Sequence, residues 1–191
     1  MDDATLRLLV NRMIRAARLE RLLYAEVAAD ITAMRQAIQV VVIVALVTAF
    51  ATLVGDLLHS QLRMTAILGL IFSPILGIIG WLAWSGITWF VGTRLIEPGI
   101  QGVEFRQVAR AAGFAEAPAI LGIVAFIPVL GVVWQLALLV WVLAAGFVAI
   151  RESMHLTNRQ AVTTLIAALV VGVIAYFILV IATIGALHAL S

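Results

Sequence analysis

The sequence predicts an all-α, polytopic membrane helix bundle, with five transmembrane helices behind an N-terminal amphipathic helix. Of its 191 residues, 64% are hydrophobic and 12% are charged, whereas soluble domains have roughly 45–50% apolar and about 25% charged residues. Long apolar runs recur along the chain with short polar segments between them. Because a spanning helix needs about 20 apolar residues, these runs occupy nearly all of the chain. We therefore expect a cytoplasmic N-terminal helix in 1–35 and a transmembrane domain in 36–191.

The first segment, residues 4–34, has the period of an amphipathic helix. At about 100° per residue, apolar residues such as Leu9 and Tyr24 fall on one side, and arginines such as Arg18 fall opposite. This pattern predicts a helix that lies on the membrane or on its own bundle, and the alternative is a docking surface for another protein. Glu20 falls within the apolar side. We expect the helix to break there, or Glu20 to meet a partner.

The five predicted spans are about 38–58, 66–95, 114–129, 131–151 and 158–187. Small and polar residues recur in the first span at three- and four-residue spacings, namely Ala45, Thr48, Ala49, Thr52 and Asp56. Such a stripe lets another helix approach closely, so it should face protein. The second span is longer than the bilayer requires, and Pro74 is a candidate kink within it.

Prolines and a capping motif set the limits of the later spans. Pro118 suits the first turn of the third span, and Pro128 with Gly131 ends it early. We expect this span to be short, broken or able to thin the bilayer locally. Before the last span, Thr157 and Gln160 have the spacing of a capping box, which predicts a helix start near residue 158.

The arginines predict the orientation of the bundle. All twelve basic residues are arginine. With five spans and a cytoplasmic N-terminus, only Arg63 falls outside, and the other arginines fall inside. Cytoplasmic loops are enriched in Lys and Arg. The sequence therefore predicts a cytoplasmic N-terminus and an extracytoplasmic C-terminus.

Residues 105–118 read FRQVARAAGFAEAP, which resembles a motif of the Yip family of Ypt/Rab-interacting membrane proteins. In that family a short amphipathic helix leads to a Gly-aromatic-Ala step, here Gly113 and Phe114, and then to a proline, here Pro118. The resemblance continues through Pro128 and Gly131 and takes in residues 146–161, with Thr157 and Gln160 at the start of the final helix.

This resemblance implies five spans with the N-terminus inside, which agrees with the orientation given by the arginines. The chain looks most like bacterial members of the family, so we expect a place in the bacterial cytoplasmic (inner) membrane. The motif of the Asp-Leu-Tyr-Gly-Pro type that precedes the first span in eukaryotic members is missing. Rab binding is therefore not carried over to this chain.

Four polar residues near membrane depth are candidate sites, because a charge is costly there. Asp56, at the outer end of the first span, is expected to bond neighbouring helix ends or to bind a proton or ion. Glu116 is expected to form a local cap or salt bridge with Arg110, or to contact a substrate. Gln135 is a candidate because, with Asp56 and Glu116, it could line a polar path through the membrane.

The sequence contains none of the common catalytic signatures. Cysteine is absent, which excludes disulfides, thiolate catalysis and thiolate metal sites. The histidines have no metal-ligand spacing, and nucleotide fingerprints are missing. The net charge of +2 gives no case for nucleic-acid binding. We expect no catalytic, cofactor-binding or metal-binding residues.

These observations favour a non-enzymatic membrane scaffold of the Yip type. Its expected partners are membrane lipids, together with another membrane protein or a second copy of the chain. The alternative is a small transporter or channel component, in which Asp56, Glu116 and Gln135 line a polar path beside an interrupted helix.

Overall fold

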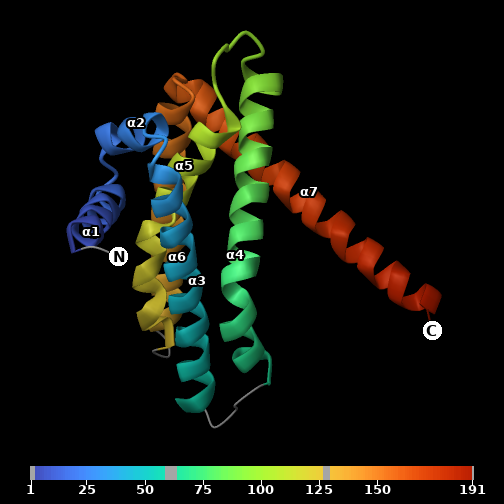
Figure 1. Ribbon diagram of the computed structural model, residues 1–191. Helices are drawn as coiled ribbons and strands as arrows, with labels where there is room; N and C mark the ends of the chain where they lie inside the picture. Colours follow the sequence, from blue (N-terminus) through green and yellow to red (C-terminus); the bar gives the residue numbers. More distant parts are fainter. Residues whose placement is uncertain (1–2, 59–63, 127–129, 191) are drawn as a thin grey trace.

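The structure is a computed structural model that describes residues 3–58, 64–126 and 130–190. Side chains are described there except at 65, 124–126, 130 and 183–190. The regular structure of the described residues is entirely helical, which confirms the all-α prediction. Figure 1 shows the helices, which are α1 (Asp3–Ala17), α2 (Arg21–Ala29), α3 (Ala33–Leu58), α4 (Met64–Phe90), the π-helical η1 (Val91–Ile96), α5 (Phe105–Ala115), the 3-10 helical η2 (Ala117–Phe126), α6 (Leu130–Ser153) and α7 (Asn158–Leu190).

Within the described part of the chain, four helices are long and apolar enough to cross a membrane. They are Ala33–Leu58, Ala66–Ile96, Gly131–Ser153 and Asn158–Ala182. They correspond to the predicted first, second, fourth and fifth spans. The second continues through Pro74 and ends in the π-helical turn η1, which the sequence analysis did not predict.

The third predicted span is not among these four helices, so the count of five transmembrane helices is not confirmed. After α5 the chain continues as η2, a 3-10 helix of ten residues. Pro118 stands in the first turn of η2, where its missing N–H costs little. The segment is short, as the sequence analysis expected. Pro128 lies outside the described residues.

The N-terminal segment forms two helices rather than one continuous helix. α1 ends at Ala17, Leu19 adopts a positive φ of 58°, and α2 begins at Arg21. Glu20 stands at this break and accepts hydrogen bonds from Arg15. Both expectations for Glu20, a break and a partner, are therefore confirmed.

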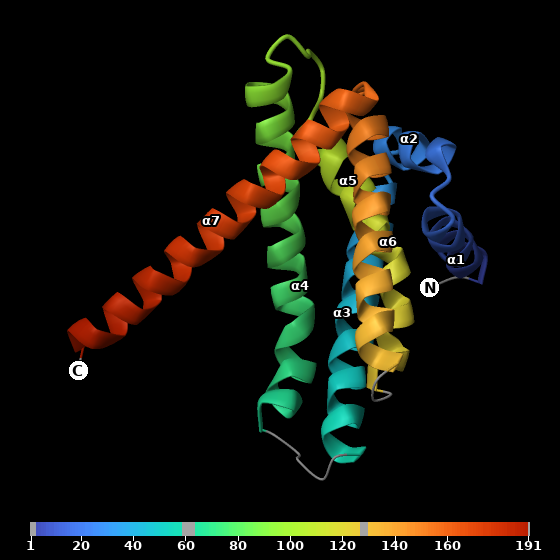
Figure 2. The same cartoon turned by 180° about the vertical axis from the view of Figure 1, so that it is seen from behind.

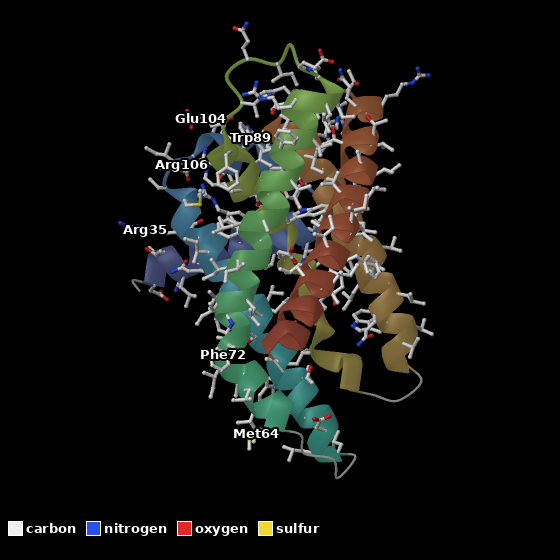
Figure 3. The ribbon with its side chains drawn as sticks, turned by 90° about the vertical axis from the view of Figure 1, so that its right-hand side faces the viewer. Arg35, Met64, Phe72, Trp89, Glu104 and Arg106 are labelled. Atoms are coloured by element: carbon white, nitrogen blue, oxygen red, sulfur yellow. The ribbon has the colours of Figure 1, made fainter. Side chains whose placement is uncertain are left out.

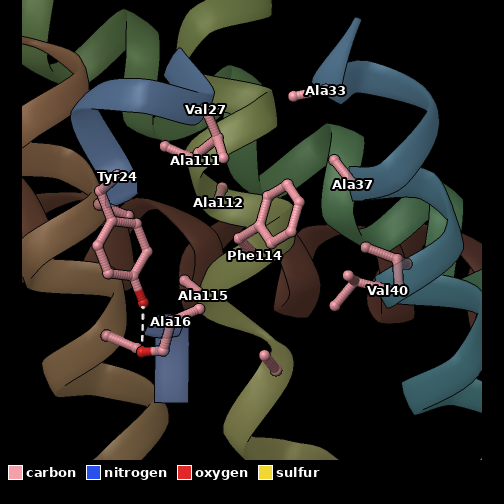
Figure 4. Close-up of a cluster of buried hydrophobic side chains, with 14 of the residues drawn as sticks. Ala16, Tyr24, Val27, Ala33, Ala37, Val40, Ala111, Ala112, Phe114 and Ala115 are labelled. Carbon is pink, nitrogen blue, oxygen red and sulfur yellow. Dashed lines mark hydrogen bonds between the residues drawn. The ribbon is translucent and has the colours of Figure 1, made fainter. Parts of the chain in front are cut away.

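α5 lies at the centre of the bundle, and all of its residues from Val108 to Ala115 are buried. Figure 4 shows the Phe114 ring among small side chains of α2, α3 and α5, including Ala37 and Ala111. A Cβ atom at Gly113 would stand 2.8 Å from Cβ of Ala37 and 3.2 Å from Nε1 of Trp81. Glycine is needed at 113 because α3, α4 and α5 meet there.

α3 and α4 lie side by side, and the small-residue stripe of α3 is directed at α4. A Cβ atom at Gly77 would lie 3.1 Å from Cβ of Ala45. The stripe therefore faces protein at this level, as predicted. Thr48 and Thr52 stay exposed because the two helices diverge and leave a groove between them.

α7 begins in contact with the bundle and then leaves it. Its capping box is confirmed, since the Thr157 amide donates to Oε1 of Gln160 over 2.9 Å. The first turns of α7 bury Ala161, Thr164 and Ala168. Figures 1 and 2 show its C-terminal half standing away from the other helices.

Candidate functional site

Side-chain hydrogen bonds are concentrated toward one end of the bundle, around α2, the start of α3, η1 and the turn between α6 and α7. We call this region the polar end of the bundle; it is the upper end in Figure 1. Figure 3 shows Glu104, Arg106 and Trp89 at this end, whereas Met64 and Phe72 lie toward the opposite end of α4. The polar end therefore differs in chemistry from the apolar remainder of the bundle.

Arg12 is the centre of this network. It is 6% exposed, although α1 itself lies at the edge of the molecule. Its guanidinium donates to Glu26 over 2.7 Å, to Asp30 over 2.9 Å and to Gln36 over 2.8 Å. These acceptors belong to α2, to the turn after α2 and to α3. One side chain thus joins three consecutive segments by charge-assisted hydrogen bonds, which are stronger than neutral ones.

The network keeps its carboxyl groups ionised. Burial disfavours the charged form of Glu26, but hydrogen bonds from Arg15 and Arg12 outweigh this cost and lower the pKa of Glu26. The pKa of Asp30 is also lowered, chiefly by the hydroxyl of Thr32 and, against some burial, by Arg12. Two guanidinium groups therefore hold three carboxylates in this cluster, since Arg12 and Arg15 pair with Glu20, Glu26 and Asp30.

Arg110 of α5 anchors the end of α2 and does not pair with Glu116, so the predicted local salt bridge is wrong. Its Nε donates to the carbonyl of Val27 over 3.0 Å, and a second nitrogen donates to the carbonyl of Ala28. The last carbonyls of a helix lack intrahelical partners and carry partial negative charge. The guanidinium group of Arg110, which is 4% exposed, supplies hydrogen-bond donors to these carbonyls and a positive charge beside their partial negative charge.

Aromatic donors complete the attachment of α1. The Tyr24 hydroxyl donates to the Ala16 carbonyl over 3.0 Å, as drawn in Figure 4, and the indole of Trp141 donates to the Ala17 carbonyl over 2.7 Å. Tyr24 is fully buried. The C-terminal carbonyls of α1 are thus held by α2 and α6.

Although firmly attached, α1 and α2 leave apolar side chains open. Leu22 on α2 and Ile31 in the following turn are 76% and 80% exposed. On α1, Leu6, Val10 and Ile14 recur every four residues and are also exposed. The surface is therefore rigidly mounted and apolar on its outer side.

The motif residues have structural roles. Phe114 and Pro118 are fully buried, and Gly131 is buried near the start of α6. The side chain of Gln160, besides closing the capping box, donates to Glu97 in the loop after η1. Of these residues, Gln160 joins two segments, the start of α7 and the loop after η1.

The polar candidates are not brought together. Glu116 stands between α5 and η2 and lines two cavities, one of about 520 Å³ between α3 and α4 and one of about 180 Å³ among α4, α5, α6 and α7. Asp56 lies near the far end of α3, and Gln135 is exposed on α6. Neither lines these two cavities. Among the described residues no group of three His, Asp or Glu side chains is placed to hold a metal ion.

Arg12 was not among the site residues predicted from the sequence, although its helix face could have indicated its burial. Arg12 follows Leu9 by three residues and precedes Ala16 by four. This spacing places it on the same helix face as these two residues, both of which are buried. The helical period therefore indicated that Arg12 is buried. It could not indicate the hydrogen-bond partners of Arg12, which lie 14 to 24 residues away in the sequence.

Comparison with known proteins identifies one family. The model of the Yip1 domain matches residues 26–182, from the middle of α2 to the exposed part of α7. No curated protein and no solved structure matches the chain.

Proposed function

The chain belongs to the Yip1 domain family, and from this premise we propose that it is a non-enzymatic integral membrane scaffold that binds other membrane proteins through α1 and α2. The observation that carries the proposal is the contrast within these helices. Arg12 and Arg110 fix their inner side to the bundle through buried hydrogen bonds. Leu22 and Ile31 remain open on the outer side.

A rigid mount favours binding, because a preordered surface loses little conformational entropy when a partner docks. Leu22 lies in the first turn of α2 and Ile31 lies just after its end, so an exposed apolar side chain stands at each end of α2. Leu22 and Ile31 are accompanied by Arg18 and Arg35, which are also exposed. A partner with an apolar anchor and acidic neighbours fits this surface.

The exposed side of α1 supports contact with lipid. Leu6, Val10 and Ile14 form its apolar stripe, and Arg7 and Arg18 border the stripe. Amphipathic helices of this kind lie in the interface, with apolar residues among acyl chains and arginines at the headgroups. We propose that α1 lies in the cytoplasmic interface and that α2 faces the cytoplasm.

For the topology we propose five crossings in the bacterial inner membrane, with the N-terminus inside and the C-terminus outside. The arginine distribution supports this orientation. In Figure 1 the chain runs from α5 through η2 away from the polar end and returns in α6. At about 2.0 Å per residue, ten residues of 3-10 helix extend about 20 Å, so η2 supplies most of a short crossing.

Cysteine labelling tests this topology, because the chain has no native cysteine. Single cysteines at Gln101 and Asn158 should react only after the membrane is permeabilised. Single cysteines at Gln61 and Ser191 should react in intact cells. Reaction at any of these sites from the opposite side would refute the five-crossing topology.

Crosslinking from the exposed surface tests the scaffold. A photoreactive residue at position 22 or 31 in the full chain should give the same discrete adduct from both positions in intact membranes. Leu22→Asp should abolish the adduct from position 31. Leu95→Asp, which changes another exposed leucine outside α1 and α2, should leave that adduct intact. Recovery of adduct-free monomer from both positions would contradict the proposal.

A further inference from the structure

A long groove runs between α3 and α4, on the part of the molecule that carries the apolar spans. Its volume is about 520 Å³, within the roughly 300–1,000 Å³ of typical ligand pockets. On α3 it extends from Val41 to Thr52, about 16 Å at 1.5 Å per residue. The groove is thus elongated along the helices, with the shape of a chain rather than of a compact molecule.

Small side chains make the walls of this groove. α3 contributes Ala45, Thr48 and Ala49, and α4 contributes glycines, together with Ser73. A Cβ atom built at Gly80 would meet nothing within 4 Å. The groove lies between two of the candidate spans, so its surroundings are lipid, and a mostly apolar cavity in lipid is filled by acyl chain rather than by water.

Glu116 stands at one end of the groove, beside Trp81 and Val41. This is the end nearer to α2 and the polar end, because Val41 lies in the first half of α3. Within the described residues, the Glu116 carboxyl group has no hydrogen bond or ion pair, since Arg110 is engaged by the carbonyls of α2. A carboxyl group at such a position is either protonated or paired with a cation, because an unpaired ionised carboxylate is costly there.

A ligand that pairs with the ionised form of Glu116 carries positive charge at the polar end of the groove. It has an apolar chain along the rest of the groove, where the lining is mostly apolar. A primary ammonium group offers charge and three N–H donors, and charge-assisted hydrogen bonds to a carboxylate are roughly twice as strong as neutral ones. A quaternary ammonium offers charge alone, and an anionic headgroup would be repelled.

We propose that this groove binds one aminophospholipid, with an acyl chain between α3 and α4 and its primary ammonium group on the Glu116 carboxylate. Glu116, which would bind the headgroup, lies at the terminus of the groove nearer to α2. The bound lipid would therefore belong to the leaflet on the α2 side of the membrane. The site is separate from the exposed surface of α1 and α2, so it stands or falls independently of the scaffold proposal.

Lipid retention in native mass spectrometry tests this site. The full chain is placed in nanodiscs of equal parts phosphatidylethanolamine, phosphatidylglycerol and phosphatidylcholine, then released into the gas phase. The wild-type chain should retain one phosphatidylethanolamine at least ten times more often than either other lipid. Retention of the three lipids in equal proportion, or preference for phosphatidylglycerol, would overturn the proposal.

Two variants separate the headgroup contact from the groove. Glu116→Gln keeps the shape and removes the charge, so the preference for phosphatidylethanolamine should fall about tenfold. Gly80→Leu fills open space in the groove, so retention of every lipid should fall. Gly146→Leu is the matched control, because its Cβ also meets nothing within 4 Å but lies in the other cavity. It should retain lipid as the wild type does.

Size-exclusion profiles and melting temperatures establish that the variants fold. If Glu116→Gln does not fold, the wild-type comparison of the three lipids, together with Gly80→Leu, still decides the question. A folded Glu116→Gln variant that keeps the full preference for phosphatidylethanolamine would refute the role of the carboxylate.

Discussion

α5 and α7 are both rich in apolar residues, yet α5 is buried inside the bundle and most of α7 is exposed outside it. α5 is buried continuously from Val108 to Ala115. In the most apolar window of α7 only 6% of the residues are buried. α5 carries Gly113, which permits close approach, and Arg110, which bonds another helix. Most of α7 has neither, and lipid tails solvate its apolar side chains as well as protein does.

Hydrophobicity favours placing a helix in the membrane, but it does not by itself pack that helix against a neighbour. Among the described residues, α7 is buried against the bundle in its first turns, at Ala161, Thr164 and Ala168, where Leu165 also packs against the core. Farther along, residues such as Ile174 and Phe177 are exposed. Three substitutions and a change of pH measure how much the close contacts and hydrogen bonds of the bundle contribute to its stability.

Gly113→Val should be the most damaging change. The added Cβ would meet Cβ of Ala37 at 2.8 Å and its Cα at 3.3 Å, so backbones must separate. Overpacking of this kind costs about 3 kcal/mol at the upper end of its usual range. Thermal unfolding in mild detergent, followed by tryptophan fluorescence, measures the loss.

Gly172→Val on α7 is the matched control for Gly113→Val. Its Cβ would only touch the Trp84 ring at 3.9 Å, and its melting temperature should stay near that of the wild type. Equal losses for the two variants would show that α7 packs more closely than the structure indicates.

Arg12→Ala should lower the free energy of unfolding by about 2–3 kcal/mol, because each hydrogen bond to a charged group contributes roughly 1.5–3 kcal/mol and the acceptors are partly exposed. Arg7→Ala, which breaks the exposed pair with Asp3, should cost about 0–1 kcal/mol. Melting temperature and protease sensitivity of the segment around Leu19 report the two effects. An Arg12→Ala variant no weaker than Arg7→Ala would show that α1 is held by its apolar contacts alone.

Acid should loosen the same network, to a smaller extent than Arg12→Ala. The pKa values of Glu26 and Asp30 lie below their usual 4.5 and 3.8. Their stabilisation is therefore fully present above about pH 4.5, and it is lost as the pH falls through the lowered pKa values of the folded state. Unfolding measured from pH 6 to about pH 3 should show a decline that is weaker in Arg12→Ala. A parallel decline in both proteins would place the sensitivity elsewhere.

Thr157→Ala should have the smallest effect, about 1 kcal/mol, which is typical of a lost N-cap. The change removes the hydroxyl that accepts a hydrogen bond from the backbone N–H of Gln160. The hydrogen bond from the Gln160 side chain to Glu97 remains. Hydrogen exchange should rise in the first turn of α7 and stay unchanged in α5. Increased exchange throughout the bundle would mean that α7 supports the core more than its burial indicates.

Features that depend on neighbours along the chain could be predicted from the sequence. Apolar runs fixed the four long helices, the capping box fixed the start of α7 at Asn158, and an acidic residue on an apolar face marked the break at Glu20. Each signal lies within a few residues of its effect, because helical period and caps are local properties.

The hydrogen-bond partners of the buried polar side chains could not be predicted from the sequence and depend on the tertiary structure. Arg110 lies six positions before Glu116 in the chain but bonds carbonyls more than 80 residues away. The Arg12 side chain is directed inward and donates hydrogen bonds to α2 and α3. The region of the third predicted span contains the 3-10 helix η2. A buried polar group must satisfy its hydrogen bonds wherever the fold brings donors and acceptors together, and sequence spacing does not reveal that place.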